Sequence, residues 1–151
     1  MIVLKRVITA SLNQSLDTSN KSVESLLTRL SSMRTDEILQ DREAIEYCYK
    51  LQDLVRVAAL AISEECGWDD TSSEIIKRND DDLMFLTRGS VYTKNKRLLD
   101  SICDNIEAVL ESKTPFKDSI DISYYRDYDN PHDIVYIIVA SGTVWMDDLL
   151  G

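Results

Sequence analysis

The sequence predicts an α+β fold in which a layer of about four helices packs on a small antiparallel sheet containing a C-terminal β-hairpin. Two observations carry this prediction. Apolar residues recur at steps of three and four over residues 23–66 and 98–110, a spacing typical of amphipathic helices. From residue 120 the pattern changes to alternation and then to a continuous apolar run, as in strands. The length of 151 residues suits one domain, so we expect residues 1–151 to form a single globular unit.

The first half of the chain is expected to be helical. Residues 3–16 and 23–33 both show helical spacing, although β-branched residues leave a strand open for the first segment. Residues 35–67 follow as one long amphipathic helix, with Thr35 as its cap and Gly67 as its stop. Unbroken, this helix would be about 46 Å long at roughly 1.5 Å per residue, which is wider than such a domain. We therefore expect a break near residues 40–43.

Residues 68–82 are polar and predict an irregular connection, with at most a helical turn at 74–78. The short apolar run at 83–86 is a candidate strand. A clean amphipathic helix is expected over 98–110, closed by Pro115.

The last quarter predicts a hairpin. Ile120, Ile122 and Tyr124 alternate with polar residues, which indicates a strand with one face in the core. A turn is expected at 129–132. Residues 134–140 are apolar at every position, so both faces of this second strand must be covered, and it should be central in the sheet, next to 83–86 or to the N-terminal segment. Residues 144–151 are expected to form a short helix that folds back on the domain, with binding in a groove of a partner protein as the alternative.

Several classes of function are disfavoured by composition. The longest apolar run has the seven residues 134–140, far short of the roughly 18 that a membrane span needs. Lys5 and Arg6 interrupt the apolar start where a secretion signal would be continuous, so we expect a cytoplasmic protein. Cys48, Cys66 and Cys103 are widely spaced and lack a C-x-x-C pair, so no zinc site is expected.

Catalytic motifs are also missing. Four glycines are too few and too scattered for a Walker loop or a dinucleotide fingerprint, and no cofactor is expected. The one histidine, His132, rules out mechanisms that need two. One alternative is a metal-dependent, nuclease-like enzyme that uses clustered carboxylates at Asp80, Asp81 and Asp82, or His132 with its neighbouring aspartates.

The distribution of charge is the feature of the sequence that says most about function. The net charge is −10, and the excess lies in residues 35–70, with ten acidic and three basic groups, and in residues 119–151, with six and one. Such a surface repels nucleic-acid phosphates and attracts basic proteins. We therefore predict a non-enzymatic, stoichiometric inhibitor or immunity-type antagonist of a basic protein surface, as bacterial immunity proteins and phage-encoded inhibitors are.

The predicted binding residues are acidic side chains with two aromatic anchors: Glu43, Glu46, Asp53, Asp121, Asp127 and Asp129, with Tyr125 and Tyr128. A further alternative is a self-assembling protein whose long helix associates through its apolar stretch at 57–62.

Overall fold

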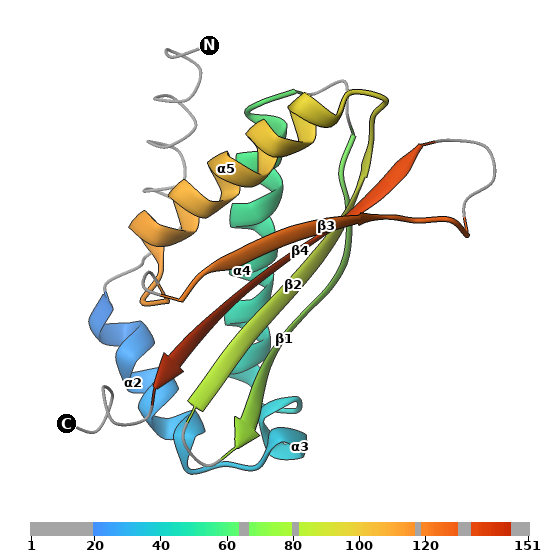
Figure 1. Cartoon of the computed structure of the whole chain (residues 1–151). Coiled ribbons are helices and arrows are strands. Elements are labelled where there is room, and N and C mark those ends of the chain that lie inside the picture. The colour runs from blue at the N-terminus through green and yellow to red at the C-terminus, as the bar shows by residue number, and fades with distance from the viewer. Residues whose placement is uncertain (1–19, 64–66, 80–81, 117–118, 130–133, 146–151) are drawn as a thin grey trace.

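The computed structural model describes residues 20–63, 67–79, 82–116, 119–129 and 134–145 (Figure 1). Within these residues the helices and strands are, in chain order, α2 (Asn20–Ser31), α3 (Thr35–Ile38), α4 (Arg42–Leu60), β1 (Asp69–Asn79), β2 (Asp82–Tyr92), α5 (Lys96–Lys113), β3 (Asp121–Arg126) and β4 (Val135–Trp145). The four strands form one sheet in the order β1-β2-β4-β3, with every neighbouring pair antiparallel. The α+β prediction is confirmed, and β3 and β4 form the expected C-terminal hairpin.

The second hairpin strand is central, as its continuous apolar run predicts. β4 pairs with β2 on one side and with β3 on the other. The neighbour is the strand that includes the apolar run 83–86, and it extends much further than that run. Val144 and Trp145 belong to β4 rather than to the predicted terminal helix, whose remaining residues 146–151 lie outside the described residues.

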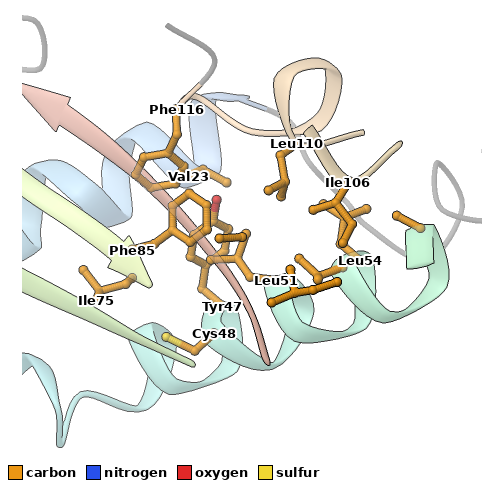
Figure 2. Close-up of a cluster of buried hydrophobic side chains, with 14 of the residues drawn as sticks. Val23, Tyr47, Cys48, Leu51, Leu54, Ile75, Phe85, Ile106, Leu110 and Phe116 are labelled. Carbon is orange, nitrogen blue, oxygen red and sulfur yellow. The ribbon is translucent and has the colours of Figure 1, made fainter. Parts of the chain in front are cut away.

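The helices cover one face of the sheet. α4 packs against β1, β2 and α5, and α5 also contacts β3 (Figure 1). Alternate residues of the strands point into this layer, because side chains alternate between the faces of a strand. Figure 2 shows the centre of the core, where Phe85 of β2 meets Phe116 and side chains of α4 approach from below. The other face carries the half-buried Met84, Leu86, Ile137 and Val139 and no described helix.

A buried polar contact joins the two longest helices. The Asn105 amide of α5 donates to the Ala58 carbonyl of α4 at 2.7 Å. Ala58 lies in the last turn of its helix, where carbonyl groups lack a partner within the helix. This contact therefore satisfies a carbonyl group that would otherwise be buried without a hydrogen bond.

The long predicted helix is broken in the region where its length led us to expect a break. α3 ends at Ile38 and α4 begins at Arg42, which confirms a break near residues 40–43. The predicted cap and stop are wrong. The Thr35 hydroxyl donates to the Lys77 carbonyl at 3.1 Å instead of capping its own helix. α4 ends at Leu60, and Gly67, with a φ of 57°, lies just before β1.

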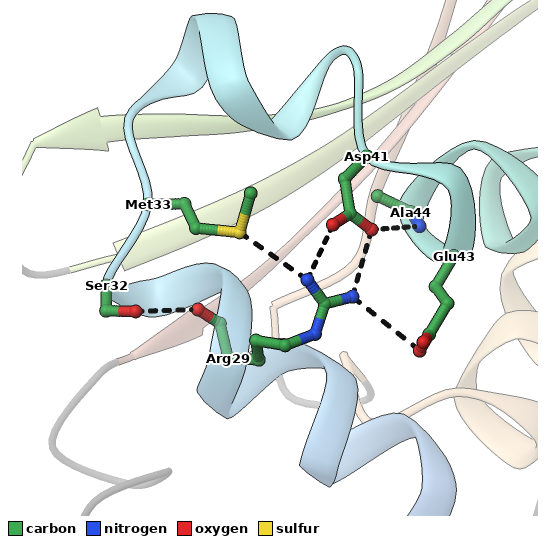
Figure 3. A network of polar contacts seen from close by, with 6 residues as sticks. All are labelled: Arg29, Ser32, Met33, Asp41, Glu43 and Ala44. Carbon is green, nitrogen blue, oxygen red and sulfur yellow. Dashed lines mark hydrogen bonds and ion pairs between the residues drawn. The ribbon is translucent and has the colours of Figure 1, made fainter.

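Asp41 makes the new start of the helix possible. Its Oδ1 accepts from the Ala44 backbone N–H at 3.0 Å, which caps α4. The Arg29 guanidinium on α2 also donates to both carboxylate oxygens, at 2.5 and 2.9 Å (Figure 3). One carboxylate thus caps α4 and ties it to α2.

This arrangement predicts a pH-dependent stability. The hydrogen bonds from Arg29 and from the Ala44 N–H lower the pKa of Asp41 from 3.8 to about 2. Because the folded pKa is depressed, the contribution is complete above about pH 4 and is lost as the pH falls from about 4 to about 2. In urea unfolding, Asp41→Asn should keep the cap but lose this pH dependence, so its deficit relative to the wild type should shrink over that interval. Asp41→Ala should cost about 0.5–2 kcal/mol more through the cap. A deficit of Asp41→Asn that is constant with pH would contradict this assignment.

The prediction for residues 68–82 is wrong. The segment is not an irregular connection with a helical turn, because residues 69–79 form β1. The strand lies at the sheet edge and most of its described residues are partly exposed, so a polar sequence is tolerated. Two register irregularities against β2 add to the departure from a regular strand pattern.

Two other predictions fall outside the described residues. They are the first helix over residues 3–16 and the turn at 129–132 beyond Asp129. The helical predictions for residues 23–33 and 98–110 are confirmed, because α2 covers most of the first range and α5 contains all of the second.

Candidate functional site

The end of the β3–β4 hairpin brings four of the predicted binding residues together. Tyr125 is 54% exposed and Tyr128 is 81% exposed. The Asp127 N–H donates to the Val135 carbonyl at 2.8 Å, and Asp127 Oδ1 accepts from the Asp129 N–H at 3.1 Å. These bonds hold the chain at the point where it leaves β3. We call Tyr125, Asp127, Tyr128 and Asp129 the hairpin tip.

The hairpin tip combines two aromatic rings with two carboxylates, those of Asp127 and Asp129. Neither Asp127 nor Asp129 forms an ion pair with another residue in the described part of the chain. A nearby cation, Arg126, places its guanidinium carbon 5.3 Å from the centroid of the Tyr128 ring, over the face of that ring. Within the described residues, no ion pair therefore competes with a basic group from outside for these carboxylates.

Asp121 lies away from the tip. It pairs with Ser141 at the beginning of β3, six residues before Asp127, which is about 20 Å along an extended strand. Its side chain is exposed on the face of the sheet opposite the helices, the same face as Tyr125.

The acidic residues of α4 form a separate group. Glu43 lies 3.6 Å from Arg29, Glu46 lies 3.5 Å from Arg42, and Asp53 contacts Arg56. Each carboxylate thus has an arginine of the same chain beside it. The negative surface that the charge count predicts along this helix is largely neutralised.

The eight predicted residues therefore do not form one surface. α4 packs under the β1 side of the sheet, whereas β3 lies at the opposite edge, next to α5 (Figure 1). The acidic residues of α4 and those of the hairpin are therefore two separate candidate surfaces. The hairpin tip is the candidate site, because its carboxylates form no ion pair within the described residues.

The described residues show few features of a metal-binding or nucleophilic site. No three His, Cys, Asp or Glu side chains converge there as metal ligands would. Burial raises the pKa of the Cys48 thiol and of the Cys103 thiol to about 11 each, so neither is a thiolate at neutral pH. Asp80, Asp81 and His132, the centres of the metal hypothesis, lie outside the described residues, and that hypothesis remains untested.

The apolar stretch proposed for self-association is covered within the chain. Ala58, Ala59 and Ala61 are buried, and none of residues 57–62 is among the exposed large apolar side chains. The apolar surface that α4 does expose lies near its other end, at Ile45 (39% exposed) and Tyr49 (66%). These two residues are four positions apart, which places them together on the surface of the helix.

No protein-family model matches the chain, and no curated protein or solved structure is significantly similar to it. None of the described helices is both long and apolar enough to cross a membrane.

Proposed function

We propose that the protein is a cytoplasmic, non-catalytic binding protein that acts as a stoichiometric inhibitor or immunity-type antagonist of a basic protein surface. One observation carries the proposal. The hairpin tip presents two exposed tyrosines beside carboxylates that have no cation of the described chain paired with them.

The chemistry of the tip suits a protein partner. Tyrosine gives a large apolar contact with a polar end and loses little conformational entropy, which is why it is common at the centre of interfaces. The carboxylates of Asp127 and Asp129 beside these rings favour lysine and arginine on the partner and disfavour acidic surfaces. The net charge of −10 adds long-range attraction that speeds encounter.

Two matched triple variants test the proposal. The hairpin variant is Asp121→Asn, Asp127→Asn and Asp129→Asn, and the helix variant is Glu43→Gln, Glu46→Gln and Asp53→Asn. Both raise the net charge by three. We expect the wild type and the helix variant to capture the same basic protein from the native host's lysate. The hairpin variant should bind that protein about tenfold or more weakly, since three partly exposed charge contacts together amount to about 1.4 kcal/mol or more.

The control separates position from net charge. The Asp127→Asn change keeps a side-chain oxygen that can accept from the Asp129 N–H, so the hairpin backbone should be unchanged in the hairpin variant. Equal losses in both triple variants would show that only the total charge matters and would contradict a site at the hairpin. Capture of an acidic protein alone would contradict the proposal altogether.

A further inference from the structure

An apolar groove lies between α3, the first half of α4 and the edge strand β1, which both helices contact (Figure 1). Its volume is about 170 Å³. Its floor is formed by the buried side chains of Ile38, Ala44, Cys48 and Ile75. A cavity of roughly 150 Å³ holds one benzene ring, so this groove has room for one aromatic or branched apolar side chain.

The wall of the groove that faces solvent is apolar as well. It is formed by Leu39, which is 48% exposed, and by Ile45 and Tyr49 of α4. Three of the seven large apolar side chains that are exposed in the described part of the chain therefore line this one groove. Single exposed apolar side chains are common on a protein surface, whereas a group of them around a hollow is typical of an interaction site.

The neighbouring edge of β1 offers no row of free backbone groups. Ile75, its main chain included, is 1% exposed, and its N–H faces the Cys48 sulfur. The Lys77 carbonyl already accepts from the Thr35 hydroxyl at 3.1 Å. An extended segment would therefore leave its own N–H and C=O groups without partners here. A helix satisfies its backbone hydrogen bonds internally and presents only side chains, so the groove suits a helix.

The groove also carries one carboxylate. Glu74 lines it, is half-buried, and forms no ion pair with another described residue. This carboxylate lies near the floor, because burial and then the charge of Glu74 raise the pKa of the Cys48 thiol. A lysine or arginine of a partner is therefore favoured beside Glu74, and an acidic residue is disfavoured.

We propose that the groove binds an amphipathic helix of a partner protein, which inserts one large apolar side chain into the groove and places a lysine or arginine beside Glu74. Ile45 and Tyr49 are one turn apart on α4, so a second apolar side chain of the partner, three or four positions from the first, lies against them. The groove and the hairpin tip lie at opposite edges of the sheet. The inference therefore goes beyond the proposed function and does not depend on it.

The test uses a displayed library of alanine-rich peptides of about eighteen residues, a length that allows partial helix formation in water. The positions i, i+3, i+4, i+7 and i+8, which share one face of a helix, are randomised, and peptides are selected on the full chain. Enriched peptides should carry an aromatic or long aliphatic residue, a second apolar residue three or four positions away, and a lysine or arginine on the same face. The same selection on Glu74→Lys should enrich aspartate or glutamate in place of the basic residue.

Cys48 reports where the peptides bind. Its side chain lines the groove, whereas Cys103 belongs to α5 and is not among the lining residues. Burial raises the pKa of both thiols to about 11, so both react slowly with an alkylating agent in the unbound protein. At a peptide concentration of about ten times Kd, alkylation of Cys48 should slow about tenfold, because only the unbound fraction reacts. Alkylation of Cys103 should be unchanged, as measured by mass spectrometry of the digested protein.

Two variants and one matched control locate the binding. Tyr49→Asp and Leu39→Asp should each weaken the enriched peptides about tenfold or more, because each puts a carboxylate on the apolar wall. Both side chains are exposed, so both variants should fold as the wild type does, which circular dichroism checks. Tyr125→Asp changes an exposed tyrosine at the other edge of the sheet and should leave peptide binding unchanged. The hairpin variant should also bind these peptides as the wild type does.

Three results would overturn the inference. One is a selection that enriches no peptide. The second is a set of enriched peptides that do not protect Cys48 and whose affinity does not respond to Tyr49→Asp or Leu39→Asp. The third is binding of the chain's own residues in the groove. It would be seen as a synthetic peptide of residues 1–19 that protects Cys48, or as a concentration-dependent dimer in sedimentation that Tyr49→Asp abolishes.

Discussion

Phe85→Ala should lower the free energy of unfolding by about 3–5 kcal/mol, the usual cost of truncating a buried aromatic ring. Phe85 is 0% exposed and lies in the middle of β2. Its ring centroid is 4.6 Å from that of Phe116, with the rings inclined at 55°, and side chains of α4 close the space below (Figure 2). The truncation removes this contact and leaves a cavity at the junction of sheet and helices.

Urea unfolding followed by circular dichroism measures this effect. Tyr125→Ala is the matched control, because it removes an aromatic ring that is 54% exposed on the opposite face of the same sheet. Its effect should stay within about 0.5 kcal/mol. A loss below about 1 kcal/mol for Phe85→Ala would place the centre of the core elsewhere.

Gly142→Ala is expected to destabilise the protein by about 3 kcal/mol, at the upper end for overpacking. Gly142 lies opposite Phe85 in the β2–β4 ladder. A Cβ atom there would be 2.4 Å from Phe85 Cε1 and 2.6 Å from Phe116 Cβ. The second atom is next to the backbone and cannot rotate away, so the main chain itself would have to move.

The neighbouring substitution and a double variant check this explanation. Ser141→Ala changes the adjacent residue on the other face and should have little effect. If the clash with the ring is the cause, Phe85→Leu combined with Gly142→Ala should cost less than the sum of the single changes, since residues in contact are not additive. Strict additivity would contradict a clash at this point.

The elements that could be predicted are those in which the pattern of apolar residues shows directly which faces are buried. The continuous apolar run of β4 implies two covered faces, and the structure places it between β2 and β3. α5 shows helical spacing throughout, and Asn95 accepts from the Arg97 N–H at 3.0 Å as its cap. For both elements the local pattern and the tertiary environment agree.

β1 could not be predicted in the same way. An edge strand forms backbone hydrogen bonds with one neighbouring strand only, and helices cover only one of its faces. Apolar and polar residues therefore need not alternate clearly in its sequence. The importance of Gly142 was equally hidden, because it depends on Phe85 and Phe116, which are far away in the sequence. The strand β1 and the tight packing around Gly142 both depend on how the strands are paired, and the composition of a segment does not show this pairing.

The candidate site was predictable only in part. The alternation in β3 and the polar residues after it place Tyr125, Asp127 and Asp129 at a hairpin end. The neutralisation of α4 was not foreseen. The Glu46–Arg42 pair can be inferred from its spacing of four, but the Glu43–Arg29 pair depends on how α2 packs against α4.

The most direct test of the proposed function is the rate of association with the captured basic protein at increasing ionic strength, measured by stopped-flow fluorescence. Attraction between opposite charges is screened over about 10 Å at about 0.1 M salt, so the association rate of the wild type should fall steeply as salt is added. The helix variant should follow the wild type, and the hairpin variant should associate more slowly with a flatter dependence. An association rate that does not change with salt, or the same slope for all three proteins, would contradict recognition by the acidic hairpin.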